Sequence, residues 1–224
     1  MIFSKKFYYF YTLTLITLMI VSYFTLDVRV AKFFLADTKT YEPIGDFISI
    51  FGESHWYIGT AIIGYLFFKY YKKNELYQQR FLFLLYINLF SGLISLVLKQ
   101  LFGRIRPWGM RKDNDDYGFL LFQNWDMSFI EKMKYHYVTL VDAPTTYTSF
   151  PSGHTTTVFA VFTYLVILFP KYLYLWLTLG IVLSSSRLLA NDHFLSDIFA
   201  GIMIGTMSTM FLYSKLRRKI EKVA

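Results

Sequence analysis

The chain has 224 residues, of which 55% are hydrophobic and 21% aromatic, and its mean hydropathy is +0.38. This composition is too apolar for an ordinary soluble domain of that length, so we expect a membrane bundle. The formal net charge is +8 and there is no cysteine, which excludes disulfides, cysteine zinc sites and thiol catalysis.

Six apolar runs approach the ~20 residues that a bilayer requires. They cover residues 7–24, 55–71, 81–98, 154–170, 172–187 and 194–213. The first run follows two lysines, as in a secretory signal, but it is long for a signal and no clear small-x-small cleavage pattern follows it. We therefore predict that this run is retained and that residues 1–224 form one all-α domain, a six-transmembrane helical bundle.

The distribution of charge predicts the orientation of these spans. With both termini on one side, that side carries twelve basic residues and only two acidic ones, Glu75 and Glu221. The basic residues are Lys5, Lys6, Lys69, Lys72, Lys73, Arg80, Lys171, Lys215, Arg217, Arg218, Lys219 and Lys222. Because short cytoplasmic loops are rich in Lys and Arg, both termini are predicted to be cytoplasmic. The basic charge then reflects topology and anionic lipids, and no nucleic-acid partner is expected.

Two longer segments fall on the opposite, extracytoplasmic side. Residues 25–54 alternate apolar and charged residues roughly at helical spacing, which predicts a helix lying along the membrane interface. Residues 103–150 are too polar to span the membrane and too aromatic for a disordered linker. We expect this insert to form a cap over the membrane surface.

Charged residues gather at the outward ends of the later spans. Lys99, Arg104 and Arg106 follow the third span, and Pro107 is expected to end that helix with the cations near the interface. Taken alone, these residues are typical of a basic collar at a membrane helix end.

The segment Pro151-Ser152-Gly153-His154 opens the fourth span. Free backbone N–H groups at a helix N-terminus attract anions, and glycine there lets a phosphate come close to the chain. Ser152 can cap the helix or donate a further hydrogen bond, and His154 is expected to point toward a bound anion. A simple N-cap with a nearby proline explains the same residues equally well.

The turn between the fifth and sixth spans carries Ser186, Arg187, His193 and Asp197. His193 and Asp197 are four residues apart, so on a helix they share one face. The aspartate can accept the proton of one imidazole nitrogen and leave the other nitrogen free to attack. A polar pair that stabilises a helix start is the alternative, but ionisable residues at membrane depth favour a functional role.

The three clusters together favour a phosphate site, because they lie at matching ends of neighbouring spans. Cations would bind the phosphate oxygens, one histidine would attack, and an acid would protonate the leaving oxygen. The other two histidines, His55 and His136, have no such neighbours and are interpreted as interface or surface residues.

The clusters resemble the signature of the type 2 phosphatidic acid phosphatase superfamily, which reads K-x6-RP, PSGH and SR-x5-H-x3-D. Every signature position is filled in order and with the expected gaps, across residues 99–197. The matching residues are Lys99, Arg106, Pro107, Pro151, Ser152, Gly153, His154, Ser186, Arg187, His193 and Asp197.

The resemblance implies a metal-independent phosphatase without cofactors. His193 would be the nucleophile that forms a phosphohistidine, Asp197 would orient it, and His154 would protonate the leaving group and later activate water. The implied phosphate ligands are Lys99, Arg106, Arg187, Ser152 and the Gly153 amide. Arg104 lies outside the signature and is only a possible ligand. Haloperoxidase relatives hold vanadate in the same pocket but are soluble, so the membrane spans favour a phosphatase.

The predicted location is a bacterial cytoplasmic membrane with the active site facing the periplasm, which implies a lipid phosphate substrate. The stretch IGDFISIFGESHWYIG and the aromatic insert look most like lipid A phosphatases. Lipid A or a related lipopolysaccharide precursor is therefore the predicted substrate of this hydrolase. The alternatives are undecaprenyl pyrophosphate, phosphatidylglycerol phosphate, and a lipid-phosphate binding or transport protein without chemistry. The bilayer and the lipid are the expected partners, and the oligomeric state stays open.

Overall fold

The computed structural model describes residues 5–110, 117–122, 127–143 and 145–221, and the regular elements within them are helical apart from isolated β-bridges at Arg104. The α-helices are α1 (Lys5–Thr25), α2 (Asp27–Leu35), α3 (Thr38–Ser49), α4 (Ser54–Leu66), α5 (Glu75–Phe102), α6 (Phe129–Asp142), α7 (Gly153–Leu168), α8 (Leu173–Leu189) and α9 (Leu195–Ile220). Short segments between them are η1 (Ile50–Gly52), η2 (Phe67–Tyr71), η3 (Pro107–Gly109), η4 (Leu120–Phe122) and η5 (Pro170–Tyr172). The predicted all-α fold class is confirmed.

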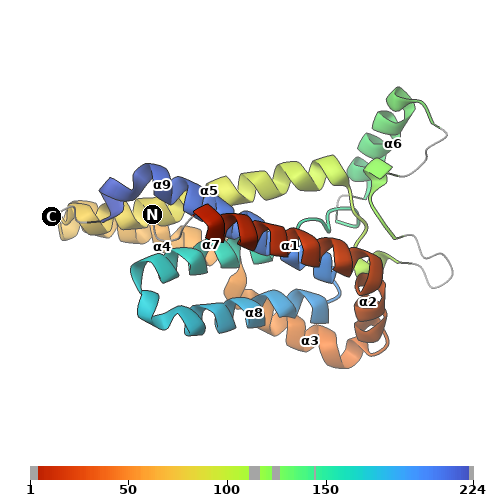
Figure 1. The fold of residues 1–224 in the computed structure, drawn as a ribbon, viewed down its shortest axis with the longest axis horizontal. Helices are drawn as coiled ribbons and strands as arrows, with labels where there is room; N and C mark the ends of the chain where they lie inside the picture. The colour runs from red at the N-terminus through yellow and green to blue at the C-terminus, as the bar shows by residue number, and fades with distance from the viewer. Residues whose placement is uncertain (1–4, 111–116, 123–126, 144, 222–224) are drawn as a thin grey trace.

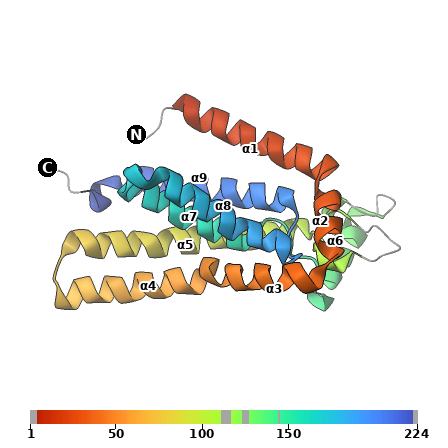
Figure 2. The same cartoon turned by 90° about the horizontal axis from the view of Figure 1, so that it is seen from below.

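Helices α1, α4, α5, α7, α8 and α9 run lengthwise, with α1 beginning and α9 ending at the same end of the bundle (Figures 1 and 2). Among the described residues, four helices are long and apolar enough to cross a membrane. They are Lys6–Thr25, Glu75–Phe102, Pro170–Leu189 and Leu195–Ile220. The other two predicted spans fall on shorter helices: α7 has 16 residues, and α4 has 13 before it widens into the π-helix η2.

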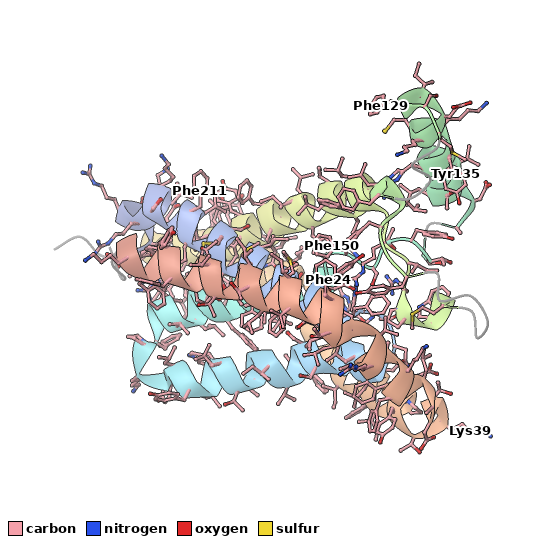
Figure 3. All side chains as sticks on the ribbon, turned by 45° about the vertical axis from the view of Figure 1, so that its right-hand side comes forward. Phe24, Lys39, Phe129, Tyr135, Phe150 and Phe211 are labelled. Carbon is pink, nitrogen blue, oxygen red and sulfur yellow. The ribbon has the colours of Figure 1, made fainter. Side chains whose placement is uncertain are left out.

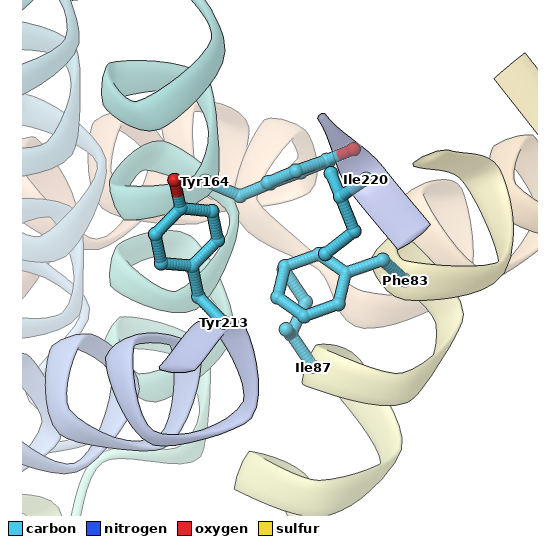
Figure 4. Packing of buried hydrophobic residues seen from close by; sticks show 5 residues of the cluster. All are labelled: Phe83, Ile87, Tyr164, Tyr213 and Ile220. Carbon is cyan, nitrogen blue, oxygen red and sulfur yellow. The ribbon is translucent and has the colours of Figure 1, made fainter. Parts of the chain in front are cut away.

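Helix α7 is central to the bundle and packs against α5, α8 and α9. It is short because Pro170 cannot continue the helix, and a new turn starts there. Most of its side chains from Thr155 to Tyr164 are buried. Near its end, a buried cluster joins α5, α7 and α9 (Figure 4): Phe83, Ile87, Tyr164, Tyr213 and Ile220.

Small residues bring α7 and α9 unusually close together. A Cβ atom on Gly201 would lie 2.8 Å from the Ser152 carbonyl oxygen, and one on Gly205 would overlap the Thr156 carbonyl oxygen. Small residues four positions apart let helix backbones approach in this way within a membrane. The contact therefore fixes the N-terminal halves of α7 and α9 relative to each other.

The segment 25–54 forms two helices where one interfacial helix was predicted. The break falls at Ala36 and Asp37, and the Asp37 carboxylate accepts a hydrogen bond from the Thr40 amide at 3.2 Å, which caps α3. Helix α2 crosses one end of the bundle, which we call the α2 end, and α3 runs beside α8 (Figure 1).

The predicted cap contains the single helix α6 among its described residues. Ser128 and Glu131 form a capping box that starts this helix. Figures 1 and 3 show that α6 lies at the α2 end and projects away from the other helices.

Candidate active site

A polar cavity of about 260 Å³ lies at the α2 end, where the ends of α5, α7 and α8 meet the start of α4. Residues from all three predicted clusters line it, together with three residues that the sequence did not single out, Glu53, Ser54 and Thr157. The full lining is Glu53, Ser54, Lys99, Arg106, Gly153, His154, Thr157, Arg187 and His193.

The end of α5 brings the first cations to the cavity. Gly103 ends this helix in a left-handed conformation with φ of 56°, which glycine adopts without strain. Lys99 lies in the last turn, and its Nζ donates a hydrogen bond to the Thr148 carbonyl oxygen. The chain then runs extended to Arg106, whose amide donates to the Thr146 carbonyl oxygen at 2.8 Å. The insert therefore orients both cations.

Asp192 bonds to two of the three cavity cations, Arg106 and Arg187. One carboxylate oxygen lies 2.7 Å from Arg106 Nη1, and the second oxygen accepts a hydrogen bond from Arg187 Nη2. Burial by itself raises the pKa of the Asp192 carboxyl, but the two guanidinium groups lower that pKa below its ordinary value. The carboxylate is therefore charged and aligns two arginines from different helix ends.

The start of α7 presents backbone to the cavity. Ser152 is fully buried and caps the helix, because its Oγ accepts a hydrogen bond from the Thr155 amide at 3.3 Å. It does not line the cavity, whereas Gly153 does. A Cβ atom on Gly153 would meet Ser95 Oγ at 3.5 Å and Lys99 Cε at 3.6 Å. The bare glycine therefore leaves the helix N-terminus open beside Lys99.

His193 and Asp197 lie together, as their spacing predicts. His193 Nδ1 is 3.7 Å from Asp197 Oδ2, which is longer than a hydrogen bond. The same Oδ2 accepts hydrogen bonds from Ser149 Oγ at 2.6 Å and from the Phe194 amide at 2.8 Å. Burial lowers the pKa of the His193 imidazole to about 3, so the ring is neutral at physiological pH.

Arg104 lies behind Asp197 and not in the cavity lining. Its side chain has no exposed surface, and its guanidinium bonds to the Asp197 carboxylate and, at 2.7 Å, to Asp27 Oδ2 on α2. Tyr117 Oη accepts a further hydrogen bond at 2.9 Å, and four aromatic rings surround the guanidinium. This placement argues against a phosphate-binding role for Arg104.

The His154 ring packs against Gly52 of η1. A Cβ atom on Gly52 would overlap the His154 ring, and it would also lie 2.8 Å from Val158. His154 Nε2 is buried and makes no hydrogen bond within the described residues. That nitrogen is therefore available to a ligand.

The remaining histidines lie outside the cavity lining. His55 is exposed, and its Nδ1 lies 3.0 Å from Glu53 at the cavity edge. His136 is buried, which differs from its interpretation as an interface or surface residue, because its Nε2 lies 2.7 Å from the Gln100 carbonyl oxygen.

The arrangement suits a tetrahedral oxyanion that reacts with an imidazole. Lys99, Arg106 and Arg187 supply positive charge, and a helix N-terminus adds backbone donors. A neutral His193 faces the same space as a second imidazole, so one ring can attack while the other transfers protons.

Comparisons with known proteins give a consistent result. Residues 80–221 match the PAP2 superfamily. The chain is 31% identical to a lipid A 1-phosphatase of Rhizobium johnstonii over 172 residues, which cover 72% of this chain and 62% of that relative's length. It is 30% identical to the lipid A 1-phosphatase of Rhizobium etli over 189 residues, 78% of this chain and 72% of that one.

The fold has a counterpart among solved structures. A crystal structure of a transmembrane PAP2-type phosphatidylglycerolphosphate phosphatase from Bacillus subtilis superposes with a TM-score of 0.55. The match covers 95% of this chain and 98% of that one at 19% identity, so it bears on the fold alone.

Proposed function

Because this chain belongs to the PAP2 superfamily, we propose that it is a membrane lipid phosphatase that works through a phosphohistidine. The observation that carries the proposal is the convergence of three cations and two imidazoles on one cavity beside a helix N-terminus. Such a site stabilises the charge on a phosphoryl group as it is transferred.

In the first step, the phosphate oxygens bind Lys99, Arg106, Arg187 and the start of α7. His193 Nδ1 faces Asp197, so Nε2 attacks phosphorus. The bond between phosphorus and the lipid oxygen breaks as a phosphorus–nitrogen bond forms. His154 gives its proton to the departing oxygen, and Asp197 stabilises the positive charge on His193.

In the second step, water hydrolyses the phosphohistidine. His154, now neutral, accepts a proton from the water while the oxygen attacks phosphorus. The phosphorus–nitrogen bond breaks and returns its electron pair to His193. Inorganic phosphate leaves, and both histidines regain their starting protonation states.

We further propose that α1, α4, α5, α7, α8 and α9 cross the membrane and that the α2 end faces the periplasm. Basic residues of the opposite end, such as Lys72, Lys171 and Arg218, support this orientation. The cysteine-free sequence makes single-cysteine labelling direct. Lys39→Cys, near the α2 end (Figure 3), should react with an impermeant maleimide in intact spheroplasts, and Lys171→Cys only after permeabilisation. The reverse labelling pattern would show that the topology is opposite to the one proposed.

The proposed substrate is the phosphate of lipid A or a related lipopolysaccharide precursor. The two Rhizobium relatives, at 31% and 30% identity, support this choice. Purified protein assayed side by side on lipid A, undecaprenyl pyrophosphate and phosphatidylglycerol phosphate should release phosphate fastest from lipid A. Faster release from either other lipid would reassign the substrate and leave the chemistry intact.

The chemistry has its own test. His193→Ala should abolish phosphate release while the protein still inserts into membranes, and alkaline quenching of the wild type with labelled substrate should trap phosphate on His193, because a phosphorus–nitrogen bond survives alkali but not acid. Asp197→Asn should lower kcat by roughly 10⁴-fold with substrate binding retained. Activity in His193→Ala, or label on a serine, would overturn the mechanism.

A further inference from the structure

Helix α6 carries a row of apolar side chains that the described residues leave uncovered. Ile130, Met133, Tyr137 and Val141 follow one another at spacings of three or four residues, so they share one side of the helix. Their exposed fractions are 79%, 43%, 69% and 58%. A row of this kind, which we call the α6 row, is unusual on a surface that faces water only.

An adjacent side of α6 attaches the helix to the bundle. His136 and Leu140 are buried, and His136 Nε2 lies 2.7 Å from the Gln100 carbonyl oxygen in the last turn of α5. The His136 ring also lies against Gly103, where α5 ends. The attachment therefore sets α6 at the level where α5 leaves the membrane.

Two further features relate α6 to the bilayer. It runs crosswise to α5 and the other lengthwise helices in both views (Figures 1 and 2). On α5, the exposed residues Leu93, Val97 and Leu101 form a lipid-facing line that ends next to this attachment. A crosswise helix at the end of a spanning helix lies parallel to the membrane plane.

Three of the four charged residues of α6 lie away from the row. Glu131, Lys132 and Asp142 fall on the opposite half of the helix, as does Tyr135. Lys134 lies on the same side as the row, where a long side chain can reach the headgroups while its stem stays apolar. This division of polar and apolar sides is the pattern of a helix in a membrane interface.

We propose that the α6 row docks into the lipid leaflet at the α2 end, beside α5. The partner is the bilayer that this chain spans, and the contact continues the lipid-facing surface of α5. Docking brings α6 to the level of the lipid headgroups, at the same end of the bundle as the cavity that would take a lipid phosphate.

The test uses the absence of native cysteine. Single cysteines at Ile130, Tyr137 and Val141, with Tyr135 and Asp142 as matched controls, carry nitroxide labels in liposomes of phospholipid alone. Docking predicts that the three row labels collide more with oxygen than with a water-soluble nickel reagent. The two control labels should show the reverse.

Each other result overturns the proposal. Equal exposure of row and control labels to the nickel reagent would mean that the helix stands in water. Strong dipolar broadening between labels would mean that a second copy of the chain covers the row. Both readouts are independent of catalysis, so they stand whether or not lipid A is the substrate.

An activity readout completes the design. The double variant Ile130→Asn/Tyr137→Asn should lower kcat/KM about tenfold for a lipid phosphate in vesicles, because the row no longer docks. A short-chain soluble phosphate ester should be hydrolysed at the wild-type rate, which shows that the fold is intact. Equal loss on both substrates, or no loss on either, would contradict the proposal.

Discussion

Asp27 Oδ2 lies 2.7 Å from Arg104 Nη2, and neither side chain has any surface exposed to solvent. The pair joins helix α2 to the extended chain after α5, and the other arm of the same guanidinium holds Asp197. Ser196 Oγ also accepts a hydrogen bond from Arg104, at 2.7 Å. Arg104 therefore holds the carboxylate that lies beside His193, from a place outside the cavity lining.

Replacement of Arg104 by lysine keeps the positive charge but loses the planar fork that reaches two carboxylates at once. We expect kcat to fall by roughly 10- to 100-fold with KM unchanged, because Asp197 shifts while the cavity cations stay in place. Steady-state kinetics on the purified variant measure both constants. A raised KM with unchanged kcat would instead make Arg104 a phosphate ligand.

The companion change Arg104→Met leaves two buried carboxylates without their countercharge. The free energy of unfolding should fall by about 3–5 kcal/mol, as found when one member of a buried ion pair is removed. Thermal or denaturant unfolding in the same detergent measures it. A stability equal to that of Arg104→Lys would show that the buried charge is compensated elsewhere.

Replacement of Gly52 by alanine should displace the His154 ring, although the two residues are far apart in the sequence. The added methyl group would overlap the His154 ring, so the ring must move from its place at the cavity. We expect kcat to fall by about 100-fold, as for loss of a general acid. Gly59→Ala on α4 is the matched control, because its Cβ would meet nothing within 4 Å. Equal activity of the two variants would rule out this constraint.

Replacement of Gly153 by alanine tests the approach of phosphate to the start of α7. The added Cβ atom would lie at ordinary contact distances from Ser95 Oγ (3.5 Å) and Lys99 Cε (3.6 Å), so the variant should fold with unchanged thermal stability. The methyl group would keep phosphate away from the backbone donors, so KM should rise by roughly tenfold. Inhibition by inorganic phosphate should weaken in parallel. An unchanged KM would show that the backbone at the start of α7 does not bind the phosphate.

The neutrality of His193 gives a prediction for pH. Burial lowers its pKa from 6.5 to about 3 in the folded protein. Between these values the unfolded chain binds a proton that the folded chain does not, so this residue makes the free energy of unfolding fall as the pH falls through that window. The His193 ring, our proposed nucleophile, stays neutral there.

NMR of the imidazole nitrogens measures the protonation state of the His193 ring directly. The His193 signals are assigned by their loss in His193→Gln. The signals should keep the neutral-ring shifts down to about pH 4. A midpoint near the ordinary value would show that the ring charges freely, and the nucleophile would then be lost in mild acid.

The sequence predicted the cavity well because its chemistry is concentrated in three short segments. Each segment sits at a helix end, and spans of similar length place such ends at one level. Two neighbouring arginines were harder to separate. Arg104 and Arg106 are separated by a single residue in an extended stretch, and the one buried behind the site is the one that binds the distant residues Asp27 and Asp197.

Other parts of the site depend on contacts that no local pattern records. Gly52 belongs to the site only because η1 packs on α7. Asp192 belongs to it only because Arg106, in the extended chain after α5, meets Arg187 at the end of α8. The sequence signal that could have identified Asp192 is its position directly before His193, in a segment with other charged residues. The break between α2 and α3 was also missed, although Asp37 before Thr38 is a typical helix start.

The backbone contact between α7 and α9 has a consequence for how this protein loses activity. Gly201 lies against the carbonyl oxygen of Ser152, the residue that caps the start of α7, and Gly205 lies one turn further along. His154 in the first turn of α7 and Asp197 in the first turn of α9 are thus held at a fixed separation by this helix pair. A detergent that loosens this pair should inactivate the protein while the helical content is still intact, so loss of turnover precedes loss of ellipticity on heating.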